Sequence, residues 1–109
     1  MNRNKNDVIA EIKTALDEAN VKANAYMNLT AKKYDYWRAL ATFNAYNQAL
    51  AMFEQGTEHK IPDMATAAIA IFERARDREI RETDLAVTDG RRDAFASVAD
   101  WMRNEEGNR

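Results

Sequence analysis

The near absence of glycine and proline constrains this chain more than any other feature of its sequence. Neither residue occurs in 1–55, and the whole chain of 109 residues contains three glycines and one proline. These two residues interrupt helices more strongly than any others, so long stretches remain in which only a helix fits the pattern. No stretch shows the apolar–polar alternation of a strand. We therefore predict an all-α fold.

Apolar residues recur at helical spacing in four parts of the chain, each with a polar side opposite the apolar one. These four predicted helices are 7–28, 30–55, 62–82 and 91–104. We expect them to form an antiparallel helical bundle that is a single domain over 1–109, with frayed ends at 1–6 and 104–109.

Short signals between the predicted helices support these boundaries. Gly56 suits the left-handed position that follows a helix, and Pro62 suits the first turn of the next one. Asp89 and Gly90 form a pair that is typical of turns, so we place a turn immediately before the last helix.

The first two predicted helices meet at Asn28, Leu29 and Thr30, where the apolar face changes phase. Thr30 could cap a separate second helix, or the two could be fused into one long helix that continues with a shift in register. We favour two helices, because helices longer than about 25 residues are uncommon in compact domains.

The charge balance and the lack of cysteine argue against several classes of protein. The chain has 16 basic and 18 acidic side chains, a formal charge of −2, which gives no general attraction for nucleic acid. Without cysteine it forms neither disulfides nor cysteine-ligated zinc sites. The polar N-terminal segment and the lack of a long apolar stretch predict neither a signal peptide nor a membrane span. We expect a cytoplasmic protein that does not bind membranes.

Residues that support catalysis are also scarce. The only histidine, His59, lies in a predicted connection, and the sequence offers no second histidine or cysteine to complete a metal site with it. The only serine, Ser97, lies in a predicted helix without the sequence context of a catalytic serine, and no glycine-rich phosphate loop is present. We therefore predict a protein that is not an enzyme and that has no cofactor and no metal.

The strongest positive signal is a concentration of aromatic residues in the second predicted helix. Six of the ten aromatic side chains lie within 34–53. This helix is apolar around more than half of its circumference, so we expect it to be buried on two sides, within the bundle or between subunits. Core packing explains many of these residues, but tyrosine, tryptophan and arginine are also enriched at binding hot spots. We predict a homodimer and a protein-binding surface formed by Tyr34, Trp37, Arg38, Tyr46 and Met52.

An amide also interrupts the apolar face of this helix, at Asn47. A buried amide must find a hydrogen-bond partner, and in this position it could fix the register between paired helices. Alternatively, the side chain lies at the end of the packed face and reaches solvent or a tyrosine hydroxyl.

Five arginines support an alternative function, nucleic-acid binding through a local anion-binding patch. Acidic neighbours such as Glu73 and Asp77 instead favour a solvated face with ion pairs inside one helix. The arginines of this alternative hypothesis are Arg74, Arg78, Arg81, Arg91 and Arg92.

Our first hypothesis is a small non-enzymatic binding protein that occludes a macromolecular partner, like the inhibitors and adaptors of phages and other mobile elements.

Overall fold

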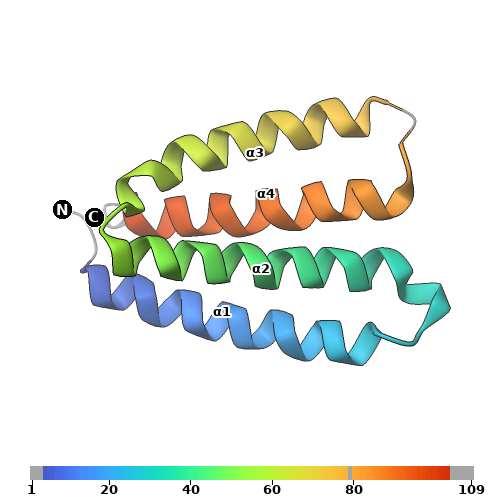
Figure 1. Cartoon of the computed structure of the whole chain (residues 1–109), viewed down its shortest axis with the longest axis horizontal. Helices are drawn as coiled ribbons and strands as arrows, with labels where there is room; N and C mark the ends of the chain where they lie inside the picture. The colour runs from blue at the N-terminus through green and yellow to red at the C-terminus, as the bar shows by residue number, and fades with distance from the viewer. Residues whose placement is uncertain (1–3, 79, 104–109) are drawn as a thin grey trace.

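The computed structural model describes residues 4–78 and 80–103, and the statements on structure below concern this part of the chain. This part contains four α-helices and no strand (Figure 1). The predicted all-α bundle of about four helices is confirmed. The elements are α1 (Lys5–Tyr26), the 3₁₀ turn η1 (Thr30–Lys32), α2 (Lys33–Gln55), the 3₁₀ turn η2 (Glu58–Lys60), α3 (Ile61–Arg76) and α4 (Glu82–Arg103).

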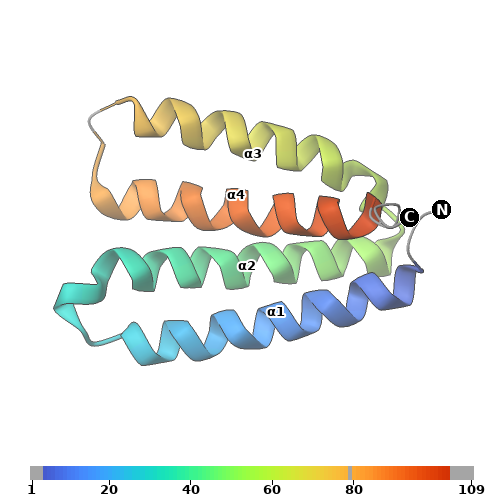
Figure 2. The ribbon, with the colours of Figure 1, turned by 180° about the vertical axis from the view of Figure 1, so that it is seen from behind.

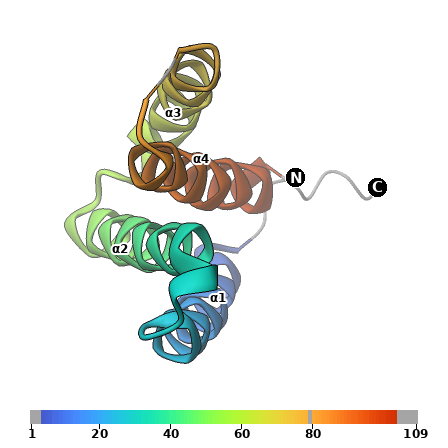
Figure 3. The same cartoon turned by 90° about the vertical axis from the view of Figure 1, so that its right-hand side faces the viewer.

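The helices pack side by side in the order α1, α2, α4, α3, so that α2 and α4 occupy the centre and α1 and α3 the edges (Figure 1 and Figure 2). Helices that follow one another along the chain run antiparallel, whereas the central helices α2 and α4 run in the same direction. Seen along its length, the molecule is a stack in which α3 lies on the far side of α4 from α2 (Figure 3). The molecule measures 44 × 29 × 28 Å.

Helix α1 begins with a capped first turn. The Asn4 side chain accepts a hydrogen bond from the backbone N–H of Asn6 at 2.7 Å, and Asp7 adds a negative charge that the helix dipole favours. The helix therefore starts slightly earlier than predicted. The other residues for which we expect fraying, 1–3 and 104–109, lie outside the described residues.

A short connection separates α1 from α2, so the prediction of two helices is confirmed over that of one long helix. Met27 ends α1, Leu29 has an extended backbone, and Thr30 begins η1 without acting as a side-chain cap. At its other end α2 stops at Gly56, as predicted. The φ angle of Gly56 is +78°, in the left-handed region, and its N–H donates a hydrogen bond to the Met52 carbonyl.

The boundary predicted between the last two helices is wrong, whereas the start of the third and the end of the fourth lie within one residue of their predicted positions. Helix α3 ends at Arg76, and α4 begins at Glu82, well before the turn that we predict at Asp89 and Gly90. These two residues are buried inside α4. A Cβ atom on Gly90 would lie only 2.3 Å from the backbone oxygen of Arg38, so the glycine lets α4 approach α2 closely. The Asp-Gly pair therefore serves helix packing and not chain reversal.

The core follows α2 and α4 along the middle of the stack. Alanines make up much of the buried side of α2, which allows its neighbours to pack closely. Because α1 and α4 cover two sides of α2, the chain itself provides the two-sided burial predicted for this helix. Asn47 is exposed, so the solvent-facing alternative is correct for this amide. The largest fully buried side chains are Phe95, Ile12, Ile61, Val8 and Val98.

Candidate functional site

The residues predicted to bind a partner lie in three different environments, and the first of these is the core. Tyr46 and Met52 are only 5% and 8% exposed, and the Tyr46 ring stacks on Trp101 with a centroid separation of 6.1 Å. Both side chains pack α2 against its neighbours. They therefore leave almost no surface for a partner.

The second environment is a set of charged and polar contacts between α2 and α4. The Tyr34 hydroxyl donates to Asp89 Oδ2 at 2.7 Å, and Arg38 Nε donates to the same oxygen at 3.0 Å. Arg38 Nη2 also donates to Asp93 Oδ2 at 3.1 Å, and Arg92 binds the other oxygen of Asp89. We refer to these five residues as the Asp89 network. Two of the predicted partner-binding residues thus find their partners within the chain.

The surroundings of the Asp89 network set the charge of its members. Burial alone raises the pKa of Asp89, but hydrogen bonds from Tyr34 and Arg92 and the charge of Arg38 outweigh it, so this pKa lies below its usual value. Burial and the hydrogen bond to Asp89 raise the pKa of Tyr34 to about 12. Burial opposes the charge of Arg38, yet Asp89 and Asp93 together raise its pKa. At neutral pH the network therefore joins a carboxylate to a neutral phenol and a charged guanidinium.

The third environment belongs to Trp37, which keeps an exposed face. It is 36% exposed, and its ring meets the Tyr36 ring edge to face with a centroid separation of 5.3 Å. Trp37 borders a hollow of about 380 Å³ at the corner between α1 and α2, where Met27 is 52% and Leu29 51% exposed. This Trp37 hollow is lined by Tyr26, Met27, Asn28, Leu29, Thr30, Lys33, Tyr36 and Trp37.

Sequence reasoning misses Met27 and Leu29 as site residues, because each continues an apolar face of a predicted helix. The signal that could identify them is the change of phase at 28–30. Where the face changes phase, apolar residues on either side of the change do not share one buried side. The chain turns there, and both side chains remain at the surface of the corner.

Lysines give the surroundings of the Trp37 hollow a positive charge. Residues 20–37 contain three lysines and one acidic residue, a formal charge of +2, in a chain whose total is −2. Lys33 lines the hollow, and no carboxylate among the described residues lies within ion-pair distance of it. Lys32 pairs with Asp35 at 3.8 Å, with both side chains about half exposed. The hollow thus combines an apolar lining with an unpaired cation.

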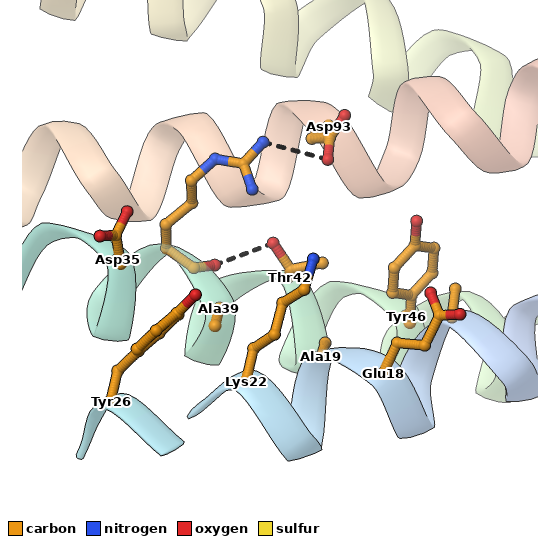
Figure 4. Close-up of a pocket in the computed structure, with 11 residues that line it drawn as sticks. Glu18, Ala19, Lys22, Tyr26, Asp35, Ala39, Thr42, Tyr46 and Asp93 are labelled. Carbon is orange, nitrogen blue, oxygen red and sulfur yellow. Dashed lines mark hydrogen bonds and ion pairs between the residues drawn. The ribbon is translucent and has the colours of Figure 1, made fainter. Parts of the chain in front are cut away.

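A second hollow, of about 260 Å³, lies between α1 and α2 and is closed on one side by Asp93 of α4 (Figure 4). Its rim carries charges of both signs, among them Glu18 and Lys22 on α1. Tyr26 lines both hollows, so the two are neighbours. Arg38 points toward Asp93 here and is already bound to it. The mixed charges of this pocket therefore define no single class of ligand.

The arginines of the alternative hypothesis do not form one free group. Arg74 and Arg78 are exposed, one near the end of α3 and the other just beyond it. The other three are already engaged within the chain, which reduces the positive charge that they offer to an anion. Arg81 binds Asp84, Arg91 binds Gln48, and Arg92 binds Asp89.

Over the described residues, every helix is too short or too polar to span a lipid bilayer, and no three His, Cys, Asp or Glu side chains gather as metal ligands would. Comparison with protein-family models, with curated proteins and with solved structures finds no match to this chain. Its function is therefore inferred from the geometry of its own surface.

Proposed function

We propose that this protein is a small, non-enzymatic binding module that contacts a protein partner through the Trp37 hollow. One observation carries the proposal: Trp37, Met27 and Leu29 expose apolar side chains around a single concave surface. Exposed apolar residues are ordinary when they are scattered singly, but a concave group of them is typical of a binding site. Tryptophan is also among the residue types that are enriched at binding hot spots.

Contacts between α2 and α4 support this role by holding Trp37 in place. Arg38, the next residue of α2, binds Asp89 and Asp93 of α4, which fixes this turn of the helix. The Tyr36 and Trp37 rings also pack edge to face. A binding residue that is already fixed loses little conformational entropy when a partner arrives. Met27 adds a flexible thioether that can adapt to the shape of the partner.

Such a module acts by occupying a surface on its partner. This is the role of an inhibitor or adaptor in the cytoplasm, and it is comparable to those that phages and other mobile elements encode. A second copy of the chain is one possible partner, as the predicted homodimer requires. The coverage of α2 by α1 and α4 removes the main reason for that homodimer, because the second helix is sheltered within one chain.

Site-specific cross-linking tests the proposed function. A photoreactive phenylalanine analogue is placed at position 37 and, in a matched control, at Val21, which is 66% exposed on α1 and does not line the hollow. Each variant is expressed and irradiated in the natural host. We expect a protein adduct from position 37 and none from position 21.

The adducts distinguish the remaining possibilities. An adduct of twice the chain mass would identify a second copy as the partner and would establish the homodimer. Equal adducts from both positions, or none from position 37, would contradict the proposal that the Trp37 hollow is the contact surface.

A further inference from the structure

The size and shape of the Trp37 hollow indicate what can enter it. Its volume of about 380 Å³ lies at the lower end of the range of about 300–1,000 Å³ that is usual for ligand pockets. The side chains of Trp37, Leu29 and Met27 line it, so its interior favours an apolar group. A large apolar side chain, presented by a short segment of another chain, matches both its size and its lining.

The charge around the hollow indicates what flanks that side chain. Lys33 lines the hollow without a carboxylate partner among the described residues, and the segment 20–37 carries a formal charge of +2. The weak pair of Lys32 with Asp35 spans 3.8 Å between half-exposed side chains, so an incoming carboxylate can compete for it. The corner is therefore a local basic surface on an acidic protein, and it complements negative charge.

We propose that the Trp37 hollow binds an acidic segment of a partner protein, with one large apolar side chain in the hollow and carboxylates facing Lys33 and Lys32. This inference rests on the proposed function and specifies the chemistry of the partner. The apolar anchor supplies most of the binding free energy, because it removes Trp37 from water. The ion pairs at the rim set the orientation of the segment and accelerate association.

An anionic lipid surface is the other partner that combines apolar contacts with negative charge. The shape of the corner argues against it, because residues that insert into a bilayer have to protrude, whereas these apolar side chains surround a concavity. Trp37 also lies against Tyr36 and exposes only 36% of its surface. A protein segment can place a side chain into such a hollow, and a flat bilayer cannot.

Selection from a random-peptide display library tests the proposal on the whole protein. The library is selected on the wild-type chain after depletion on Trp37→Ala, so that peptides which bind elsewhere are removed. We expect the enriched peptides to share one large apolar residue flanked by aspartate or glutamate. A synthetic copy of an enriched peptide should lose at least about 30-fold in affinity with Trp37→Ala. Circular dichroism of this variant confirms that it remains folded.

Charge reversal separates the role of the lysines from a general effect of charge. Lys33→Glu should weaken the binding of the acidic peptide by about fivefold. The matched control Lys60→Glu makes the same change of charge in η2, at the opposite end of the molecule (Figure 1). It should leave affinity almost unchanged. An equal loss with both variants would overturn the proposed contact with Lys33.

Two-dimensional ¹H–¹⁵N NMR spectra locate the bound peptide, because the chain has two tryptophans and therefore two indole N–H signals. The signal of Trp37 should shift on titration, and that of Trp101, which packs on Tyr46, should not. Peptides that depend on Trp37 but have neutral or basic flanks would overturn the acidic chemistry and leave the proposed function standing. The absence of any peptide that depends on Trp37 would overturn both. Binding to phosphatidylserine vesicles that is lost with Trp37→Ala would overturn the proposal in favour of a lipid surface.

Discussion

At the scale of single residues, Gly90 is a position where the structure leaves no room for a side chain. A glycine inside a helix makes the helix less stable than an alanine at the same position by about 1 kcal/mol, when other contacts are equal. Here a Cβ atom would lie 2.3 Å from the Arg38 backbone oxygen and 2.8 Å from Thr42 Oγ1, so the two central helices would have to move apart. We expect Gly90→Ala to lower the free energy of unfolding by about 2 kcal/mol, measured by urea denaturation.

A second substitution removes the side-chain contact at Gly90 and leaves the backbone contacts. The nearer contact is with a backbone oxygen, which no side-chain replacement removes. Gly90→Ala should therefore lower the free energy of unfolding by almost the same amount in the Thr42→Ala background as in the wild type. If Gly90→Ala were as stable as the wild type or more stable, helix propensity would outweigh packing, and the close approach of α2 and α4 would be in doubt.

Tyr34 and Arg38 show what the sequence leaves open at the residue scale. Both lie off the main apolar face of the second helix, and we interpret that position as a surface for a partner. In the structure, α4 brings Asp89 and Asp93 to this side, where Asp89 binds both residues and Asp93 binds Arg38. Helical periodicity tells on which face a residue lies, but not which other helix packs on that face. Trp37 can be identified as a site candidate from its residue type, whereas the hollow beside it cannot be predicted.

At the scale of the elements, α3 has the fewest buried residues of the four helices in the described part of the chain. It packs mainly on α4 at one edge of the stack, and it buries Ile61, Ala65 and Ala68 (Figure 3). The other edge helix, α1, buries one residue more, and its buried residues are Val8, Ile12, Ala19 and Ala23. We expect the backbone amides of α3 to exchange with deuterium faster than those of α1, through local opening. Hydrogen exchange followed by NMR measures this, and equal protection of α1 and α3 would contradict it.

The helices themselves could be predicted, but the boundary between the last two could not. Gly56 ends α2 because its backbone conformation is a local requirement, visible in the sequence. Leu85 lies on the polar side of a continued third helix, which predicts a break near Thr83. The break falls between Arg76 and Glu82, which allows α4 to extend far enough for Asp89 to reach α2. The position of the break therefore depends on a contact between α2 and α4, which are distant in sequence.

At the scale of the whole molecule, the parallel arrangement of α2 and α4 accounts for the position of the candidate site. Because the two helices are parallel, residues that come later in α2 contact residues that come later in α4. Arg38 binds Asp93, and further along both helices the Tyr46 ring stacks on the Trp101 ring. The charged contact and the aromatic contact lie at different positions along the helix axes, so only one register of α2 against α4 satisfies both. The charged contact lies beside Trp37, so the interaction that aligns the central helices also fixes the corner that carries the hollow.

The Asp89 network further determines how the stability of the molecule depends on pH. The pKa of Asp89 is lower in the folded protein than in the unfolded chain. Its stabilisation is therefore complete above about pH 4 and is lost as the pH falls through the folded value. Tyr34 behaves in the opposite sense, because its pKa of about 12 exceeds the unfolded value of about 10. Its stabilisation is complete below about pH 10 and is lost between about pH 10 and 12. We expect thermal stability to be nearly constant from about pH 5 to 9 and to fall on both sides.

Tyr34→Phe isolates the alkaline part of this profile, because phenylalanine keeps the ring and removes the ionisable hydroxyl. In thermal melts followed by circular dichroism, the variant should lose less stability than the wild type as the pH rises from about 9 to about 11. Some loss should remain, because burial also raises the pKa of Tyr46 in the core. Asp89→Asn should lower stability at neutral pH and flatten the acidic part instead, since it removes the carboxylate that Tyr34 and Arg38 bind. If Tyr34→Phe lost stability at alkaline pH as steeply as the wild type, ionisation of Tyr34 would not be linked to folding, and its hydrogen bond to Asp89 would not contribute to stability.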